Sequence, residues 1–313
     1  MSGASSEMGP AKESSGPPAE VLVWRSLLYV PANNERFIGK AHTRGADGII
    51  LDLEDSVPEA ERDGARSMLA ATAAQAGQDG ADVVVRINRP DAEAGRDLDA
   101  AVIPGVKALM LPKVPDADHV RSRAEAVSAL ESERGMEADS IKFVVMVEDP
   151  SALFRVDGIA AAHPRNVAAF LGGEDFAAAA GMVPDPETLF LPKVMTLYAA
   201  RAAGIMPLGM IGTVADYRDL DGVRENVRRS RRFGFEGASC IHPSVVPVLN
   251  EEMTPSADEV ERAERIVEAY GAAEKEGLGA VTVDGMMVDV PVAERARALL
   301  RRHAAIQERE KTS

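Results

Sequence analysis

Short apolar runs alternate with helix-like stretches along most of this chain, and this alternation constrains the fold more than any other feature. The runs are rich in β-branched and aliphatic residues throughout, which is typical of strands buried on both faces of a parallel sheet. Parallel strands need long crossover connections, usually helices, so the alternation indicates repeated β/α units. We expect strands at Ser26–Val30, Gly48–Leu53, Val83–Ile87, Ala108–Leu111, Phe143–Val147, Val167–Leu171, Ile205–Ile211 and Ala238–Ile241.

Eight such units in about 220 residues fit a (β/α)8 TIM barrel better than an open sheet. With 46% hydrophobic residues, the chain can fill the large core that this α/β fold requires. We therefore expect a barrel over residues 21–250. The predicted helices include Asn34–Arg44, Ala60–Gln75, Ala117–Arg134, Leu189–Ala203 and Leu220–Arg232.

Both ends of the chain differ from this central region. Residues 1–20 are mostly Ser, Gly, Pro, Ala and Glu without an apolar period, so we expect a disordered arm. Residues 251–313 begin with a capping-box pattern at Ser256 and Glu259, which predicts a helix. An Asp284-Gly285 turn between short strands follows, and Pro291 opens a last helix. We expect this C-terminal extension to pack on the barrel or reach a neighbouring subunit.

The net charge of −15 argues against nucleic-acid and anionic-membrane partners, because both are polyanions. An anionic ligand must therefore meet a local Lys, Arg or metal ion. No apolar run approaches the about 18 residues of a membrane span. The single cysteine, Cys240, rules out an intramolecular disulfide, and no secretory signal is visible, so we expect a cytoplasmic protein.

Ionisable residues follow six of the predicted strands, where a barrel places its active site. Glu148 and Asp175 follow neighbouring strands without His or Cys companions, which suits Mg²⁺ or Mn²⁺. Arg86 on the same rim could hold a substrate carboxylate in a two-point grip. A metal ion beside an arginine would receive a 2-oxo or 2-hydroxy acid, which points to carbon–carbon bond chemistry.

These residues also have structural interpretations. Asp149 would cap the helix that follows it, which leaves Glu148 without a local role. Asp175 could similarly cap a helix over Phe176–Ala180. Arg86 could instead neutralise the acids around it, and we expect a supporting shell made of Asp52, Glu54, Asp55, Lys113 and His242.

Seven motifs between Arg25 and His303 resemble the HpcH/HpaI aldolase–citrate lyase beta-chain family in its CitE-like branch. The resemblance implies a TIM barrel, Mg²⁺ dependence, and trimers or hexamers. It also implies lyase chemistry on CoA thioesters such as citryl-, malyl- or citramalyl-CoA. The motifs are RSLLYVPANNERFIGKA, GADGIILDLEDSVPEA, VVVRINRP, LMLPKV, GGEDFAAAAGM, GFEGASCIHP and DGMMVDVPVAERA.

The resemblance also implies roles for particular residues. Glu148 and Asp175 would bind the metal, and Arg86 would grip the substrate carboxylate. Asp289 would act as a general acid/base in the active site of a neighbouring subunit. Arg36 and Lys40 would contact CoA or substrate. Departures from the family pattern occur at Asp149, Gly209 and Ala238.

The implied reaction splits, or forms, a 3-hydroxy-3-carboxyacyl-CoA, with a 2-oxo acid and acetyl-CoA or a homologue as the other partners. Three alternatives remain open. The chain could be a metal-dependent pyruvate aldolase that uses no CoA, or a malyl-CoA-type thioesterase. It could also be a barrel that only binds ligands.

Overall fold

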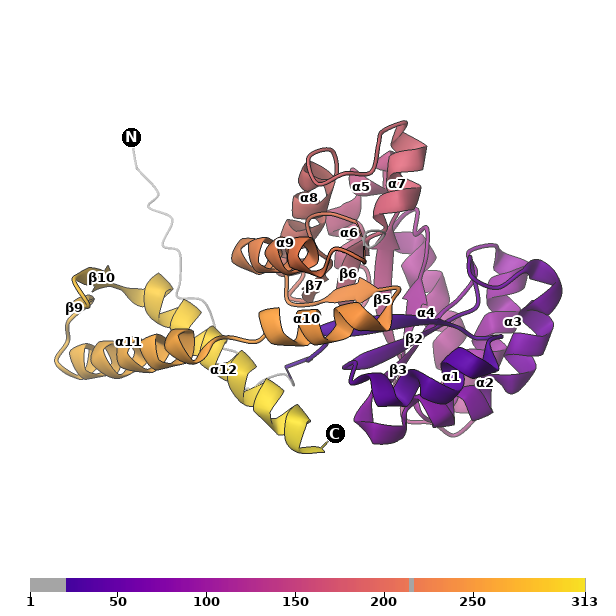
Figure 1. Cartoon of the computed structure of the whole chain (residues 1–313), viewed down its shortest axis with the longest axis horizontal. Coiled ribbons are helices and arrows are strands. Elements are labelled where there is room, and N and C mark those ends of the chain that lie inside the picture. The colour runs from indigo at the N-terminus through magenta and orange to yellow at the C-terminus, as the bar shows by residue number, and fades with distance from the viewer. Residues whose placement is uncertain (1–20, 214–216, 313) are drawn as a thin grey trace, which may run out of the picture.

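The computed structural model describes residues 21–213 and 217–312 and contains an eight-stranded parallel sheet with the order β7-β6-β5-β4-β3-β2-β1-β8 (Figure 1). A bridge between Leu208 and Gly237 links the two ends of this order, so the sheet closes into a barrel and the predicted fold is confirmed. The N-terminal segment predicted to be disordered, 1–20, lies outside the described residues. The strands are β1 Ser26–Pro31, β2 Gly48–Asp52, β3 Asp82–Arg86, β4 Val106–Leu111, β5 Lys142–Val147, β6 Asn166–Leu171, β7 Met206–Leu208 and β8 Ala238–Cys240.

The helices surround the barrel and continue into a C-terminal projection (Figure 1). Among the residues that the structure describes, none of the helices is apolar over a length sufficient to cross a membrane. The helices are α1 Glu35–Ala41, α2 Arg62–Ala76, α3 Asp91–Ala101, α4 Ala117–Glu133, α5 Pro150–Leu153, α6 Val156–Ala160, α7 Gly173–Ala180, α8 Phe190–Ala202, α9 Leu220–Phe233, α10 Val246–Glu252, α11 Ala257–Lys275 and α12 Val290–Thr312.

Strand β7 is shorter than the sequence predicts, at three residues instead of the seven of Ile205–Ile211. Pro207 has no N–H to donate to a neighbouring strand, and Gly209 adopts a φ of 133° that side chains rarely allow. The strand therefore ends at Leu208. The Gly209 N–H donates to Gly237 O at 2.8 Å, which continues the ring closure past the end of the strand.

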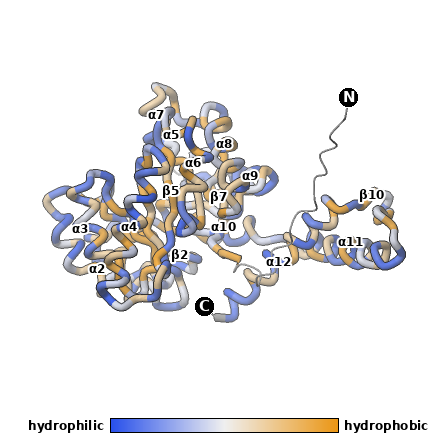
Figure 2. The backbone as a smooth tube through the Cα atoms, turned by 180° about the vertical axis from the view of Figure 1, so that it is seen from behind, coloured by the Kyte–Doolittle hydropathy of each residue, from blue (hydrophilic) through white to orange (hydrophobic). Residues whose placement is uncertain are grey.

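Two apolar layers fill the fold. Alternate strand residues such as Ile50 and Val84 point inward with Trp24 and close the barrel interior. Their chain neighbours, such as Ile49, point outward and pack against the helices. Figure 2 shows apolar segments along the strands and polar segments on the outer turns of α2 and α3. Cys240 ends β8 inside this core, and burial raises the pKa of its thiol to about 12.

Residues 257–301, which we call the arm, project away from the barrel (Figure 1). The capping box at Ser256 and Glu259 is confirmed at the start of α11. Strands β9 (Val281–Val283) and β10 (Met286–Val288) form an antiparallel hairpin whose turn residues have positive φ values, 50° at Asp284 and 76° at Gly285. The arm has its own small core, made of Ala263, Ile266, Tyr270, Val288, Ala293 and Ala296.

Candidate active site

Glu148 follows β5 at the carboxyl end of the barrel and is only 3% exposed. Its Oε2 accepts a hydrogen bond of 2.5 Å from the backbone N–H of Lys113, which follows β4. Burial raises the pKa of Glu148 to about 7, and repulsion from Glu54 and Asp175 adds to the increase. A carboxylate held in this way is stabilised when a cation enters the site.

Gly172 forms the wall behind Glu148. A Cβ atom at this position would lie 2.4 Å from Glu148 Oε1 and 2.7 Å from its Cγ, far inside normal contact distances. The absence of a side chain therefore leaves the space that the carboxylate occupies. Gly172 is also the N-cap of α7, so the prediction that Asp175 caps this helix is wrong. Because α7 begins at Gly173, Asp175 lies inside its first turn, and its side chain is 43% exposed at the barrel mouth.

Arg86 ends β3 and is held by acids on one edge. Asp52 accepts hydrogen bonds from Arg86 Nε and Nη2, both at 2.7 Å. Arg86 Nη1 lies 3.0 Å from Glu54 and 3.2 Å from Asp55, whose side chain is 52% exposed. Burial opposes the charge of Asp52, but its hydrogen bonds and the charge of Arg86 lower its pKa. The guanidinium is therefore fixed on one edge by Asp52, while Nη1 faces the mouth.

Lys113 connects the acids of the mouth. Its Nζ bonds Glu54 at 2.7 Å and lies 3.5 Å from Asp55 and 3.8 Å from Asp175. Its backbone has a φ of 49°, a conformation that a non-glycine residue seldom adopts. This geometry turns the Lys113 N–H toward Glu148 while the side chain reaches the opposite acids. Strain at such a position is often associated with function.

The mouth fits a hard divalent cation. Glu148 and Asp175 supply carboxylate oxygens, the ligand type that Mg²⁺ prefers. Among the residues that the structure describes, no group of three or more acidic, His or Cys side chains is arranged to hold a metal ion by itself. Two carboxylates would leave coordination positions for water and substrate oxygens, which is the usual arrangement for Mg²⁺.

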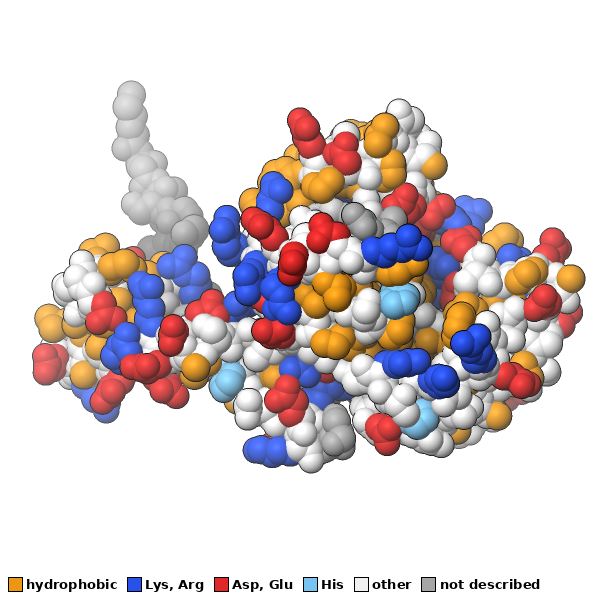
Figure 3. Space-filling model, in the orientation of Figure 1, with side chains coloured by type: hydrophobic (Ala, Val, Ile, Leu, Met, Phe, Trp, Pro, Cys, Tyr) orange, Lys and Arg blue, Asp and Glu red, His pale blue; other side chains and the backbone are white. Residues whose placement is uncertain are grey.

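A cavity of about 420 Å³ lies beside this mouth. Tyr29 and Ser56 form the wall next to Arg86, since the guanidinium stacks 5.0 Å above the Tyr29 ring and Ser56 bonds Asp52. Figure 3 shows hydrophobic side chains next to a histidine on this side of the molecule, with Lys and Arg side chains nearby. The other residues that line the cavity are Leu28, Val30, Pro31, Phe37, Ala41, Arg44, Ile241, His242 and Pro243.

Helix α1 borders the cavity through Phe37 and Ala41 and carries Arg36 and Lys40, both exposed. His242 lies on the opposite wall. Its Nδ1 is 2.7 Å from Ser244 Oγ, and its ring stacks on Tyr217 at 4.6 Å. His242 is therefore held by local contacts, and its role as a supporting residue of the site stays a prediction.

Asp289 is separate from these residues. It lies at the start of α12 in the arm and accepts a hydrogen bond from Val292 N at 3.4 Å. The arm extends away from the barrel (Figure 1). The structure therefore brings together Glu148, Asp175, Arg86, Lys113, Glu54, Asp55 and Asp52, and it leaves Asp289 elsewhere in this chain.

Three residues near the mouth were missed by sequence reasoning: Gly172, Tyr29 and Lys193. Lys193 lies in α8, is buried, and donates from Nζ to the backbone oxygens of Met210, at 2.7 Å, and Gly212. Burial lowers the pKa of Lys193 to about 8. A lysine within the apolar stretch LFLPKVMTL is a recognisable signal, because lysine is rarely buried. Tyr29 gave a weaker signal, as a phenol within an apolar strand.

Fold and site together define an α/β-barrel protein whose mouth combines several carboxylates, an arginine, a lysine and an adjoining cavity. The family model for HpcH/HpaI aldolase/citrate lyase matches residues 25–243, and the chain belongs to that family.

The relatives and solved structures agree with this assignment. The citrate lyase subunit beta of Haemophilus influenzae is 33% identical over 281 residues, which cover 89% of this chain and 96% of that protein. A (3S)-malyl-CoA thioesterase of Cereibacter sphaeroides is 34% identical over 287 residues, covering 90% and 95%. CitE from Mycobacterium tuberculosis, solved with magnesium, acetoacetate and coenzyme A, has a TM-score of 0.69 at 30% identity and covers 89% of this chain and 97% of its own.

Proposed function

We propose that this protein is a Mg²⁺-dependent carbon–carbon lyase that acts on a 3-hydroxy-3-carboxyacyl-CoA thioester such as citryl-, malyl- or citramalyl-CoA. The observation that carries the proposal is the buried Glu148 carboxylate, whose pKa is raised to about 7 beside Asp175 and Glu54. Glu54 in turn lies 3.0 Å from Arg86 Nη1. Relatives that carry this fold were solved with magnesium and with oxo acids such as oxaloacetate. The acids of this mouth suit the same ion.

Glu148 and Asp175 would hold the metal ion. When bound, Mg²⁺ supplies positive charge where negative charge develops on the substrate oxygen. Lys113 keeps the Glu148 carboxylate in place through its backbone N–H. Gly172 leaves room for that carboxylate behind it.

Arg86 would hold the substrate carboxylate. Its Nη1 faces the mouth next to Asp55, an exposed acid that can move aside when a substrate carboxylate arrives. Asp52 fixes the guanidinium plane from the opposite edge through two hydrogen bonds of 2.7 Å. A fixed guanidinium loses little entropy on binding, which favours orientation of the substrate.

The cavity of about 420 Å³ would take the acyl chain and the pantetheine group of the thioester. Its apolar lining suits those groups, and Arg36, Lys40 and Arg44 lie near its border, where phosphates need positive charge. This neighbourhood favours a CoA thioester over a free hydroxy acid. A pyruvate aldolase that uses no CoA would leave these groups without a ligand.

Cleavage would break the bond between the carbinol carbon and the α-carbon of the thioester. The hydroxyl would give its proton to solvent water, and the 2-oxo acid would form as the electron pair of the broken bond stays on the α-carbon as an enolate. That carbon would then take up a proton. Asp289 of the partner subunit would deliver that proton, since the Asp289 of the same chain lies in the projecting arm. This role requires an assembly such as a homotrimer or hexamer.

Purified protein with Mg²⁺ should be incubated with citryl-, malyl-, methylmalyl- and citramalyl-CoA while acyl-CoA, free CoA and 2-oxo acid are followed together. A lyase releases a shorter acyl-CoA and its matching 2-oxo acid, and EDTA stops the reaction. Free CoA with an intact hydroxy acid would instead identify a thioesterase, the activity named for the Cereibacter sphaeroides relative. No turnover with any thioester would contradict the proposal.

Two variants test the assigned residues. Glu148→Gln should lose turnover by orders of magnitude, whereas the exposed acid Glu133, changed to Gln, should have no effect. Asp289→Asn should lose turnover but still bind Mg²⁺ and oxo acid. Full activity of Glu148→Gln would refute the metal site, and full activity of Asp289→Asn would make its motif structural.

A further inference from the structure

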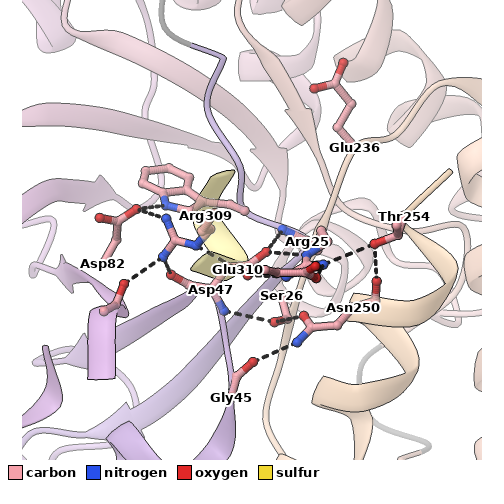
Figure 4. Close-up of polar contacts among 12 residues, drawn as sticks. Arg25, Ser26, Gly45, Asp47, Asp82, Glu236, Asn250, Thr254, Arg309 and Glu310 are labelled. Carbon is pink, nitrogen blue, oxygen red and sulfur yellow. Dashed lines mark hydrogen bonds and ion pairs between the residues drawn. The ribbon is translucent and has the colours of Figure 1, made fainter. Parts of the chain in front are cut away.

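The C-terminal end of α12 returns to the barrel at the face opposite the mouth. Arg309 lies between the amino ends of two strands (Figure 4). Its Nη1 is 3.1 Å from Asp82, the first residue of β3, and its Nη2 donates to the backbone oxygen of Asp47, which precedes β2. A further hydrogen bond of 3.1 Å reaches Gly80 O.

The next residue, Glu310, makes an independent contact. It accepts a 2.6 Å hydrogen bond from Arg25 Nη1, just before β1 (Figure 4). Arg25 itself is buried and held by Asp47 through Nε and Nη2, each at 2.9 Å. We call the contacts of Arg309 and Glu310 with Arg25, Asp47 and Asp82 the latch. The latch rests on groups that the barrel already fixes.

A second anchor lies seven residues earlier on the same helix. Arg302 donates to Glu236 O and lies 3.1 Å from Glu236 Oε2, in the segment that leads into β8. At 1.5 Å per residue, the two anchors are about 10 Å apart along α12. Two separated anchors fix the direction of a helix, whereas a single anchor would allow it to pivot.

Helix α12 runs from these anchors to Asp289. The distance from Arg309 to Asp289 is about 30 Å along the helix at the same rise per residue. If the latch is lost and the helix pivots by 10° at Arg302, which lies about 20 Å from Asp289, Asp289 moves by about 3.5 Å. A misplacement of about 1 Å can already cost a catalytic group 100-fold in rate. The direction of α12 thus decides whether Asp289 can reach a substrate.

We propose that Arg309 is a positioning residue: through the latch it aims α12 so that Asp289 enters the active site of a second copy of this chain. The inference rests on the proposed function, in which Asp289 serves a partner subunit. It adds that the chain which supplies Asp289 also sets the direction of its own α12. The contacts that do so lie on the face of its barrel opposite the mouth.

Mixed assemblies of two full-length variants test the inference. One chain, the acid donor, carries Glu148→Gln and has an intact arm. The other, the metal-site donor, carries Asp289→Asn and has an intact mouth. A functional site needs the mouth of the second chain and the arm of the first, so a random equal mixture should recover about one quarter of wild-type activity.

Arg309→Ala is then added to one chain at a time. In the acid donor it should lower the recovered activity at least 10-fold, and in the metal-site donor it should leave that activity unchanged. Arg309→Lys in the acid donor should give an intermediate rate, because an ammonium cannot reproduce the guanidinium contacts. Arg301→Ala, an exposed arginine on the same helix, is the matched control and should be silent in either chain.

The outcomes separate this inference from the proposed function. Equal loss in both chains, or a change of assembly size by light scattering, would make Arg309 a residue of fold or assembly and overturn the inference alone. No loss in either chain would overturn it as well. If the starting mixture recovers no activity while wild-type protein turns over, then Asp289 is not shared between chains. That result overturns this inference and the role of Asp289, while the lyase activity of the proposed function stands.

Discussion

Gly172→Ala is expected to disable the metal site without changing any acidic residue. The added Cβ would lie 2.4 Å from Glu148 Oε1, whereas ordinary contacts begin near 3.4 Å. Gly172 has a φ of −74°, so alanine adopts the backbone without strain and the clash falls on the carboxylate. Glu148 must therefore retreat by about 1 Å, well beyond the about 0.2 Å that metal–ligand distances tolerate.

The size of the effect follows from this displacement. Disturbing the partners that orient a metal ligand typically costs 10- to 100-fold in affinity, and here the ligand itself moves. We expect Mg²⁺ and Mn²⁺ affinity to fall by at least that factor, or about 1.4 to 2.7 kcal/mol. The retreat also weakens the 2.5 Å hydrogen bond from Lys113 N, so stability should fall by about 1 to 3 kcal/mol.

Titration calorimetry with Mn²⁺ measures the affinity, and Gly173→Ala is the matched control. A Cβ at Gly173 meets a movable side-chain carbon, Leu189 Cδ1 at 3.0 Å, instead of Glu148. In a Glu148→Ala background, Gly172→Ala should have no further effect on metal binding, because the clashing carboxylate is gone. Wild-type Mn²⁺ affinity in Gly172→Ala would refute the assignment of Glu148 as a ligand positioned against Gly172.

Three further expectations concern stability. In a thermal-shift titration, Mg²⁺ should raise the melting temperature of the wild type but not that of Glu148→Gln. An equal increase in the melting temperatures of both proteins would place the ion elsewhere. Burial opposes the charge of Glu131, but hydrogen bonds from Arg165 and Ile141 N outweigh it and lower its pKa to about 2. That carboxylate therefore stabilises the fold by about 3 kcal/mol above about pH 5, and this stabilisation is lost as the pH falls toward 2. Urea unfolding should show that the free energy of unfolding falls less steeply below pH 5 in Glu131→Gln than in the wild type. An equal pH dependence in the two proteins would count against the ion pair. Gly237→Ala would place a Cβ 1.7 Å from Trp24 O, where the barrel closes. Thermal unfolding should therefore show a loss of more than about 4 kcal/mol in the free energy of unfolding. Gly158→Ala is the control and should be tolerated, because a Cβ there meets open space.

The sequence was sufficient to predict the barrel because apolar runs and helices alternate with little interruption. The same pattern placed the ionisable residues at one end, since parallel strands share a direction. Asp149 was correctly interpreted as a helix cap, and it accepts hydrogen bonds from Ser151 N at 2.7 Å and Ala152 N at 3.0 Å. These features depend on local spacing, which a single sequence displays.

The features that the sequence did not reveal depend on contacts between strands. The hydrogen bond from Lys113 N to Glu148 comes from the backbone, which carries no residue-specific signal. The role of Gly172 depends on the distance between β5 and β6, which no local pattern encodes. Helix α3 was missed because its sequence, DAEAGRDLDAA, contains one large apolar residue, Leu98. Its burial comes from packing instead of periodicity.

The buried thiol at the end of β8 offers an experimental opportunity. Cys240 is 1% exposed and its pKa is about 12, so it stays protonated and shielded from maleimide or methanethiosulfonate reagents at neutral pH. A cysteine introduced at the exposed Met287 of the hairpin would then react selectively in an otherwise unaltered chain. Spin labels or fluorophores attached there could report the separation between arms by dipolar spectroscopy or energy transfer, with the native cysteine left in place.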